Sequence, residues 1–120
     1  MAILLITHDW EVVAQIADRT VVMYAGEVVE EAAAADLLTA PEHPYARALL
    51  ACDPVRAHPG RRLPVIPGSV PVPGAWPSGC RFAPRCPEAE PRCGAEPVAF
   101  TRTAAHHITR CVHAEARLEA

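Results

Sequence analysis

The chain has 120 residues, about one small domain, which excludes a complete large enzyme with its own cofactor domain. Hydrophobic residues make up 51% and charged residues 21%, as in an ordinary globular protein, but the thirteen prolines far exceed the usual share of about 5%. Every proline lies between Pro41 and Pro97. An opening segment rich in aliphatic residues is therefore followed by one that is unsuited to long helices or central strands.

Charge is unevenly distributed along the chain. The net charge is −3, but residues 1–53 carry nine acids and two arginines (−7), residues 54–120 carry five acids and nine arginines (+4), and lysine is absent. A charge of +4 without interleaved aromatic residues predicts no nucleic-acid partner. The longest early apolar run, residues 2–6, is too short to cross a membrane and lacks the flanks of a signal peptide, which predicts a cytoplasmic chain.

The first expected element is a strand. Residues 2–7 form a continuous apolar run that suits a strand buried on both faces of a parallel sheet. Because such a strand needs neighbours, we expect that a segment N-terminal to it is missing. Asp9 suits the cap of a following helix. The apolar face of that helix falls at positions i, i+3, i+4 and i+7, which are Trp10, Val13, Ala14 and Ala17.

A β-hairpin is expected next. Two β-branched runs, residues 20–24 and 27–30, are separated only by Ala25 and Gly26. A two-residue connection with glycine where a positive φ is needed predicts a tight hairpin turn.

Two short helices and a long connector follow. Residues 32–39 predict a helix that Pro41 ends, and Pro44 suits the first position of a second helix. From residue 53 to residue 79 a proline recurs every few residues with little periodicity. This stretch predicts an extended connector rather than a core.

Five cysteines in a cytoplasmic chain indicate metal ligands or free thiols rather than disulfides. Cys52, in an aliphatic helical stretch, is expected to be a small buried thiol. The other four have spacings x5, x6 and x17, which match neither a zinc ribbon nor a ferredoxin run. These four candidate ligands are Cys80, Cys86, Cys93 and Cys111.

Each of these four cysteines has an arginine beside it in the sequence, whereas Cys52 has none. Neighbouring cations favour thiolates and offset the negative charge of four of them, which supports a metal site. Three histidines are candidate substitutes for a thiolate, with His113 first among His106, His107 and His113. The alternative is that all four cysteines are unligated thiols in a flexible tail.

His8 directly follows the expected first strand, at the end where open α/β sheets place their ligands. An imidazole there can donate a hydrogen bond to a phosphate oxygen. The alternative is a polar residue that caps a strand end. A metal-binding pair of His8 and Asp9 is weaker, because no further ligand follows at helical spacing.

Short motifs run through nearly the whole chain, at residues 5–9 (Leu-Ile-Thr-His-Asp), 17–19, 22–26, 29–30, 43–45 (His-Pro-Tyr), 67–68, 79–82, 85–86, 93 and 111. In this order they resemble the C-terminal part of the ATP-binding subunits of oligopeptide and dipeptide ABC transporters. The Thr-His-Asp turn alone indicates an ABC ATPase, whereas His-Pro-Tyr followed by four cysteines is specific to the peptide-transporter branch.

The resemblance implies an α/β fold in three parts. Residues 1–52 would be the C-terminal remnant of an ABC-type P-loop NTPase domain, residues 53–79 a connector, and residues 80–120 an irregular Pro/Cys-rich extension. His8 would be the switch histidine that senses the γ-phosphate of ATP. The four cysteines would hold a 4Fe-4S iron–sulfur cluster, since some members hold one in this extension, with zinc as the alternative.

The function implied is that of a fragment of an ATP-binding subunit that couples ATP binding and hydrolysis to peptide uptake. Its partners would be a second ABC ATPase subunit, integral-membrane permease subunits and, indirectly, a peptide-binding protein, with the chain peripheral on the cytoplasmic side of the plasma membrane. The sequence has no G-x-x-x-x-G-K-S/T loop, ABC signature or Walker B strand, so we expect no ATP hydrolysis by this chain alone. The alternative is a stand-alone iron–sulfur or zinc-binding module, or an adaptor, without ATPase activity.

Overall fold

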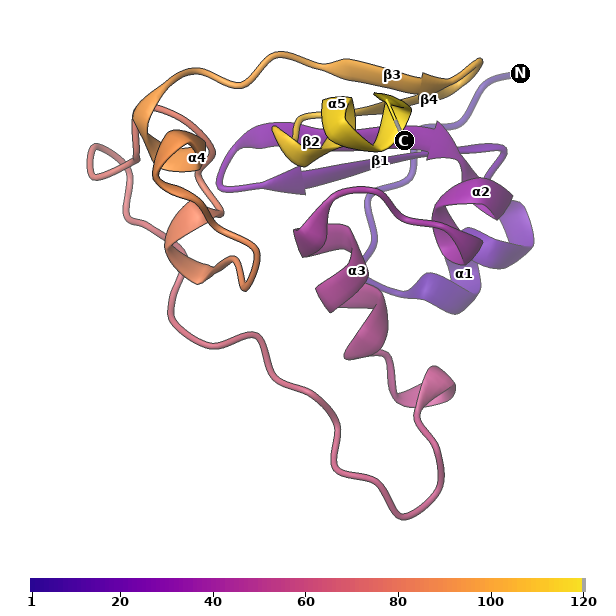
Figure 1. The fold of residues 1–120 in the computed structure, drawn as a ribbon. Helices are drawn as coiled ribbons and strands as arrows, with labels where there is room; N and C mark the ends of the chain where they lie inside the picture. The colour runs from indigo at the N-terminus through magenta and orange to yellow at the C-terminus, as the bar shows by residue number, and fades with distance from the viewer. Residues whose placement is uncertain (120) are drawn as a thin grey trace.

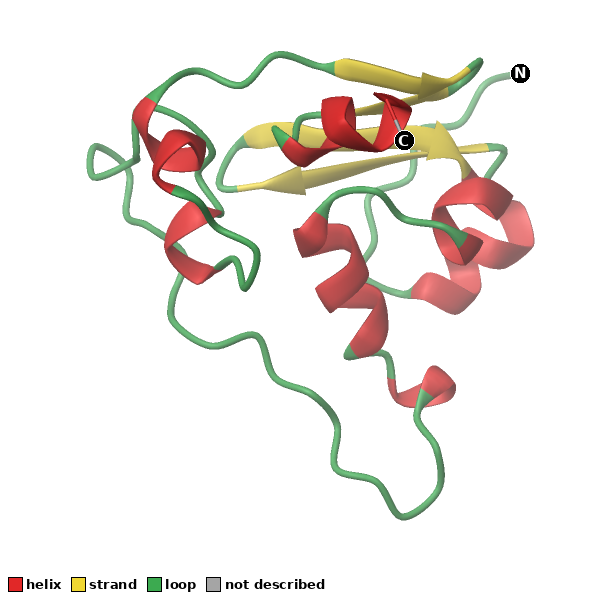
Figure 2. Cartoon of the chain, in the orientation of Figure 1, coloured by secondary structure: helices red, strands yellow, loops and turns green. Residues whose placement is uncertain are grey.

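The computed structural model describes residues 1–119 around one four-stranded antiparallel sheet, in the strand order β1-β2-β4-β3 (Figure 1). Helices α1, α2 and α3 lie on one side of this sheet (Figure 2). Within residues 1–119 the elements are α1 (Trp10–Ile16), β1 (Arg19–Tyr24), β2 (Glu27–Ala33), α2 (Ala34–Thr39), α3 (Pro44–Ala51), α4 (Pro91–Ala95), β3 (Thr101–Ala104), β4 (His107–Thr109), α5 (His113–Glu119) and 3-10 turns at Pro54–Arg56 and Ala83–Arg85.

The strand expected at residues 2–7 is not formed in the described part of the chain. A strand exists only where a neighbour pairs with its backbone, and the described sheet offers residues 2–7 no neighbour. Their apolar side chains are exposed, with Leu4 and Ile6 each 91% exposed. This segment therefore presents apolar surface rather than a buried core strand.

Helix α1 begins at the expected cap. The carboxylate of Asp9 accepts hydrogen bonds from the backbone N–H of Glu11, at 2.9 Å, and of Val12, at 3.3 Å. None of the helix residues is buried, although Trp10 lies against the core. The helix carries Trp10, Val13 and Ala14 of the expected apolar face, with Trp10 and Val13 half-buried, but it ends at Ile16, so Ala17 lies outside it.

The hairpin of β1 and β2 lies where the sequence predicts it. Its two turn residues both have positive φ, 49° at Ala25 and 83° at Gly26, as a two-residue turn that matches the strand twist requires. Alternation along β1 puts Val22 and Tyr24 in the core and leaves Met23 57% exposed. The hairpin therefore supplies one face of the core.

Helix α3 also begins where it was expected. Pro44 occupies its first position, and the side chain of His43 caps it by accepting a hydrogen bond at 3.1 Å from the backbone N–H of Tyr45. Leu50 is buried on its inner face, and α2 buries Leu37 against the same core.

The expectation that residues 80–120 are irregular is wrong in part, because they add two strands to the sheet. Strand β4 pairs with β2, where Glu30 lies opposite Thr109, and β3 pairs with β4. The free edge of the hairpin supplies unpaired backbone groups, and pairing with β4 satisfies them. The extension thus shares one sheet with the hairpin, and α5 contacts β3.

A buried polar pair fastens β4 to β2. His107 and Glu30 are both buried, and Nε2 of His107 lies 2.5 Å from Oε1 of Glu30. The Glu30 carboxylate also accepts the backbone N–H groups of Glu42, at 2.7 Å, and of His43, at 2.8 Å. A single side chain of β2 therefore holds both the extension and the segment that leads into α3.

Residues 57–79 contain no helix or strand and form the long loop below α3, as expected for the connector (Figures 1 and 2). Arg85 ties this loop back to the domain. Its guanidinium donates to the carbonyl of Pro67 at 2.8 Å and to that of Ile66 at 3.1 Å.

An aromatic cluster anchors the start of the extension on the core. Phe82 is 1% exposed, with its ring centroid 5.2 Å from that of Tyr24 and 5.3 Å from that of Tyr45. These three rings come from the extension, the hairpin and α3. Their packing fixes the position of the neighbouring Cys80.

Candidate functional site

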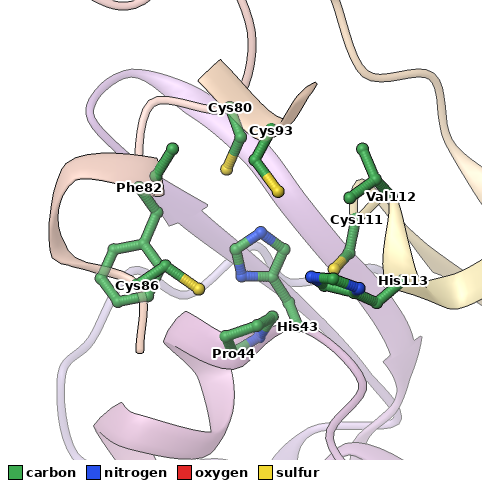
Figure 3. Close-up of a pocket in the computed structure, with 10 residues that line it drawn as sticks. His43, Pro44, Cys80, Phe82, Cys86, Cys93, Cys111, Val112 and His113 are labelled. Carbon is green, nitrogen blue, oxygen red and sulfur yellow. The ribbon is translucent and has the colours of Figure 1, made fainter. Parts of the chain in front are cut away.

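All four predicted ligands line one cavity of about 20 Å³, at the junction of the extension with the start of α3 (Figure 3). They come from four separate segments: the start of the extension (Cys80), the residue after a 3-10 turn (Cys86), helix α4 (Cys93) and the residues after β4 (Cys111). Other residues of the wall are His43, Pro44, Phe82, Ala83, Val112 and His113.

Two backbone hydrogen bonds place Cys80 beside Cys93. The N–H of Cys80 donates to the carbonyl of Cys93 at 2.7 Å, and the N–H of Gly79 donates to the carbonyl of Gly94 at 3.1 Å. A Cβ on Gly79 would lie 2.3 Å from the carbonyl oxygen of Cys93. Only glycine therefore permits this approach of the two cysteine segments.

Burial is the main electrostatic influence on these thiols. It raises the pKa of Cys80, Cys86 and Cys111 above the usual value for cysteine. Backbone groups oppose burial and lower the same pKa values: Phe82 and Ala83 at Cys80, Glu88 at Cys86, and His113 at Cys111.

The fourth sulfur, that of Cys93, accepts a hydrogen bond at 3.3 Å from the backbone N–H of Glu90. This is the hydrogen bond that the structure gives to a sulfur of the four cavity cysteines within residues 1–119. With raised pKa values, Cys80, Cys86 and Cys111 are protonated at neutral pH, so a metal has to displace their protons to bind.

The expectation that adjacent arginines favour the thiolates is wrong for the three cysteines whose pKa is raised. The guanidinium groups are directed elsewhere: Arg81 donates to the carbonyl of Ala25 at 2.5 Å, and Arg110 to that of Val28 at 3.1 Å. Arg92 pairs with the Glu90 carboxylate at 2.8 Å. Two of these arginines instead fasten the extension to the hairpin.

His43 is the residue of this site that sequence reasoning missed. It is 1% exposed, and burial, followed by the positive charge of Arg47, lowers its pKa to about 4, so its ring is neutral at pH 7. Nδ1 accepts the N–H of Tyr45, whereas Nε2 is buried without a hydrogen-bond partner among the described residues. The His-Pro-Tyr motif was the available signal, but nothing in the sequence connects it with the distant cysteines.

Of the three candidate substitute histidines, only His113 lines the cavity. Its Nε2 lies 2.8 Å from the carbonyl oxygen of Glu88. His107 is occupied by Glu30, and His106 is exposed in the turn between β3 and β4.

Within residues 1–119, no three His, Cys, Asp or Glu side chains are already arranged to hold a metal ion. The predicted metal site therefore stays a prediction. Cys52 lies outside the cavity of the four cysteines: it lines a separate cavity of about 430 Å³, and its Sγ donates to the carbonyl of Pro64 at 3.1 Å.

His8 is exposed at a bend that leads into α1. The bend is shaped by its neighbours, because the N–H of Asp9 donates to Oγ1 of Thr7 at 3.0 Å and the carboxylate of Asp9 caps α1. His8 is not among the residues that line the cysteine cavity.

A comparison with protein families decides the affiliation. The sequence model of the family described as "Oligopeptide/dipeptide transporter, C-terminal region" matches residues 29–93, more than half of the chain. The chain belongs to this family. The match runs from β2 to α4 of this oligopeptide/dipeptide transporter region, and it includes His43 and three of the four cysteines but not Cys111.

Curated relatives agree with this affiliation. The oligopeptide transport ATP-binding protein AppD of Bacillus subtilis is 53% identical over 92 residues, which are 77% of this chain and 28% of AppD. The dipeptide transport ATP-binding protein DppD of Escherichia coli is 45% identical over 111 residues, 92% of this chain and 34% of DppD. The chain thus matches ATP-binding proteins of peptide transporters and spans about a third of their length.

In the described part of this family member, none of the helices is both long enough and apolar enough to span a membrane.

Proposed function

We propose that this chain is the C-terminal part of an ATP-binding subunit of an ABC importer for oligopeptides or dipeptides. The family match over residues 29–93 carries the proposal, and the names of AppD and DppD agree with it. The subunit would pair with a second ATPase subunit and dock on permease subunits at the cytoplasmic face of the membrane. ATP hydrolysis would then drive uptake of a peptide that a binding protein delivers.

Residues 1–52 would form the end of the nucleotide-binding domain. The exposed apolar side chains of residues 2–7 support this assignment, because leaving them in water is unfavourable and a pairing strand from the rest of the domain would cover them. The sequence contains no phosphate loop, so the groups that grip the ATP phosphates would come from that remaining part.

His8 would contribute the γ-phosphate sensor. Its exposed imidazole lies at a bend that Thr7 and Asp9 hold in shape, and a ring N–H there is able to donate to a phosphate oxygen. When the γ-phosphate leaves, this hydrogen bond is lost, which couples the bend to the state of the nucleotide.

A chimera tests this function. The 111 residues that match DppD would replace the corresponding third of DppD in an Escherichia coli strain that lacks DppD and cannot make one amino acid, which is supplied only within a dipeptide. The chimera should support growth, its His8→Ala variant should not, and its Cys52→Ser variant should. Growth that is indifferent to His8→Ala would refute the switch role, and failure of the unaltered chimera at normal protein level would count against the importer assignment.

We also propose that Cys80, Cys86, Cys93 and Cys111 hold a metal centre, with a 4Fe-4S cluster as the first candidate and zinc as the alternative. The supporting observation is that all four thiols line one cavity, where the sulfur of Cys93 accepts a hydrogen bond from the backbone N–H of Glu90. A bound centre would cross-link segments of a proline-rich extension that has little core of its own.

The positions of the four thiols indicate what each metal centre would require of the site. Tetrahedral zinc with bonds of about 2.3 Å would draw the sulfurs to about 3.8 Å from one another. The described thiols are not gathered in this way, and the His43 ring lies between them (Figure 3). The free volume of about 20 Å³ is small, so the thiols must turn to admit either a zinc ion or the larger cluster.

Metal analysis of anaerobically purified protein tests the centre. The chain should carry iron with acid-labile sulfide and a broad visible absorption, and Cys86→Ser should abolish both while Cys52→Ser leaves them intact. Colourless protein with one zinc per chain would replace the cluster by zinc. Equal metal loss in the two variants would remove the distinction between the four cavity cysteines and Cys52.

A further inference from the structure

The wall of the four-cysteine cavity contains a buried side chain that is not one of the four proposed ligands. This is the imidazole of His43, which is 1% exposed and enters the cavity from the residue before α3. Figure 3 shows the ring between the sulfurs, with one nitrogen facing Cys80 and Cys93. Glu30 holds the backbone in this place, since its carboxylate accepts the N–H of His43 at 2.8 Å.

The hydrogen bonds of His43 fix its tautomer. Nδ1 accepts the backbone N–H of Tyr45 at 3.1 Å, so Nδ1 carries no proton. The neutral ring must then carry its proton on Nε2. That N–H is buried without a partner among residues 1–119, and an unpartnered buried donor costs free energy.

We propose that His43 donates this Nε2–H to a sulfur of the metal centre. The inference rests on the metal centre of the previous section. A thiolate is an acceptor of the required charge, and Cys80 and Cys93 lie on the side that the free nitrogen faces (Figure 3). His43 would be a positioning residue that orients a ligand sulfur and withdraws negative charge from it.

The same hydrogen bonds argue against His43 as a metal ligand. Coordination through Nε2 would move the ring proton to Nδ1, where it would collide with the N–H that Tyr45 directs at this atom and would remove the cap of α3. A competing acceptor for the Nε2 proton is the backbone of Arg110, which raises the pKa of His43 against the larger effect of burial.

NMR with cadmium as a diamagnetic probe of the thiolate site tests the proposal on the full 120-residue chain. In protein with labelled nitrogen and NMR-active cadmium, His43 should keep a proton on Nε2, and that proton should couple to cadmium through the N–H···S bond. His43→Asn keeps an acceptor for the N–H of Tyr45 but removes the imidazole and its Nε2–H. This variant should still bind one cadmium per chain, with a shifted cadmium resonance and no imidazole coupling.

His113→Asn is the matched control, because His113 lines the same cavity but its Nε2 already meets the carbonyl of Glu88. The coupling from His43 should survive this change. A direct bond between cadmium and Nε2 would overturn the donor role. So would a protonated Nε2 without coupling in cadmium-loaded protein, since the proton would then be given to Arg110.

A different result distinguishes failure of the metal centre itself. If the unaltered chain binds no cadmium, or if Cys86→Ser binds it equally well, the site proposed for the four cysteines falls, and the role of His43 falls with it.

Discussion

The substitution Gly79→Ala should destabilise the chain because it forces two backbone segments apart. The added Cβ would lie 2.3 Å from the carbonyl oxygen of Cys93 and 2.4 Å from that of Glu96. Both neighbours are backbone atoms, so no side chain can rotate away to make room. The segment that carries Cys80 must therefore move off α4.

The cost follows from what that movement breaks. Steric overpacking in a closely packed region costs about 1–3 kcal/mol. The hydrogen bonds from Cys80 to Cys93 and from Gly79 to Gly94 are lost or stretched, at about 1 kcal/mol each. Alanine also restricts the unfolded chain more than glycine does, which stabilises the folded chain by less than about 1 kcal/mol. The net loss in the free energy of unfolding is therefore about 3 kcal/mol.

Urea unfolding followed by circular dichroism measures this loss, and the melting temperature should fall by about 10 °C. The matched control is Gly94→Ala, whose new Cβ would lie 3.8 Å from Cβ of Ala83, an ordinary contact, inside helix α4. Alanine suits a helix better than glycine by about 1 kcal/mol, so this variant should be as stable as the parent or slightly more so. If Gly79→Ala and Gly94→Ala unfold at the same urea concentration, the close approach has been misjudged.

Three further predictions concern the core and the cavity. Glu30→Ala leaves buried donors without an acceptor and should lower the free energy of unfolding in urea by about 3–5 kcal/mol. The control Glu31→Ala, at a part-exposed site, should change it by less than about 0.5 kcal/mol. Equal losses in the two variants would contradict the role of the Glu30 carboxylate. In the same assay Phe82→Ala should lower the free energy of unfolding by about 3–5 kcal/mol, and Trp76→Ala, at a 39% exposed site, by far less. If Phe82→Ala costs no more than Trp76→Ala, the Phe82 ring does not anchor the extension. The pKa of His43 is about 4 in the folded chain and 6.5 in the unfolded chain, so between these two pH values only the unfolded chain binds a proton there. After chelation of metal, the free energy of unfolding should therefore fall by about 3 kcal/mol from pH 6.5 to pH 4. A His43→Asn variant with the same pH dependence would refute this.

Local signals explain which elements the sequence predicts. The hairpin follows from Ala25 and Gly26, since a two-residue turn with positive φ fixes the pairing of the strands on either side. Helix α3 follows from Pro44, whose fixed φ suits a first helical position. In both cases the residues that decide the structure lie within the element itself.

Elements that depend on distant partners escape such reasoning. Strands β3 and β4 have only four and three residues, too few to show a reliable alternation, and they form because β2 offers a free edge. Residues 2–7 have the pattern of a strand but no neighbour with which to pair in the described structure. The hydrophobic pattern of a segment therefore shows that it is able to form a strand, and backbone pairing with a neighbouring strand decides whether it does.

The site shows the same limit for side chains. Four of the five cysteines line one cavity and Cys52 does not, but the metal site expected for the four stays a prediction. Adjacency in the sequence misled the interpretation of the arginines, since Arg81 reaches the hairpin turn and Arg110 the carbonyl of Val28 instead. His43 enters the cavity from the loop before α3, where the Glu30 carboxylate of β2 accepts the backbone N–H groups of Glu42 and His43.

The Glu30 carboxylate links the sheet to the wall of the cysteine cavity. Its carboxylate joins β4 through His107 and the start of α3 through Glu42 and His43, so the cavity wall and the sheet share one buried acceptor. A change that opens the cavity for a bound group therefore cannot move the backbone of His43 without straining the junction of β2 and β4. For this reason the four cysteines belong to the folded core of the chain, and any group they bind would be linked to the stability of the whole sheet.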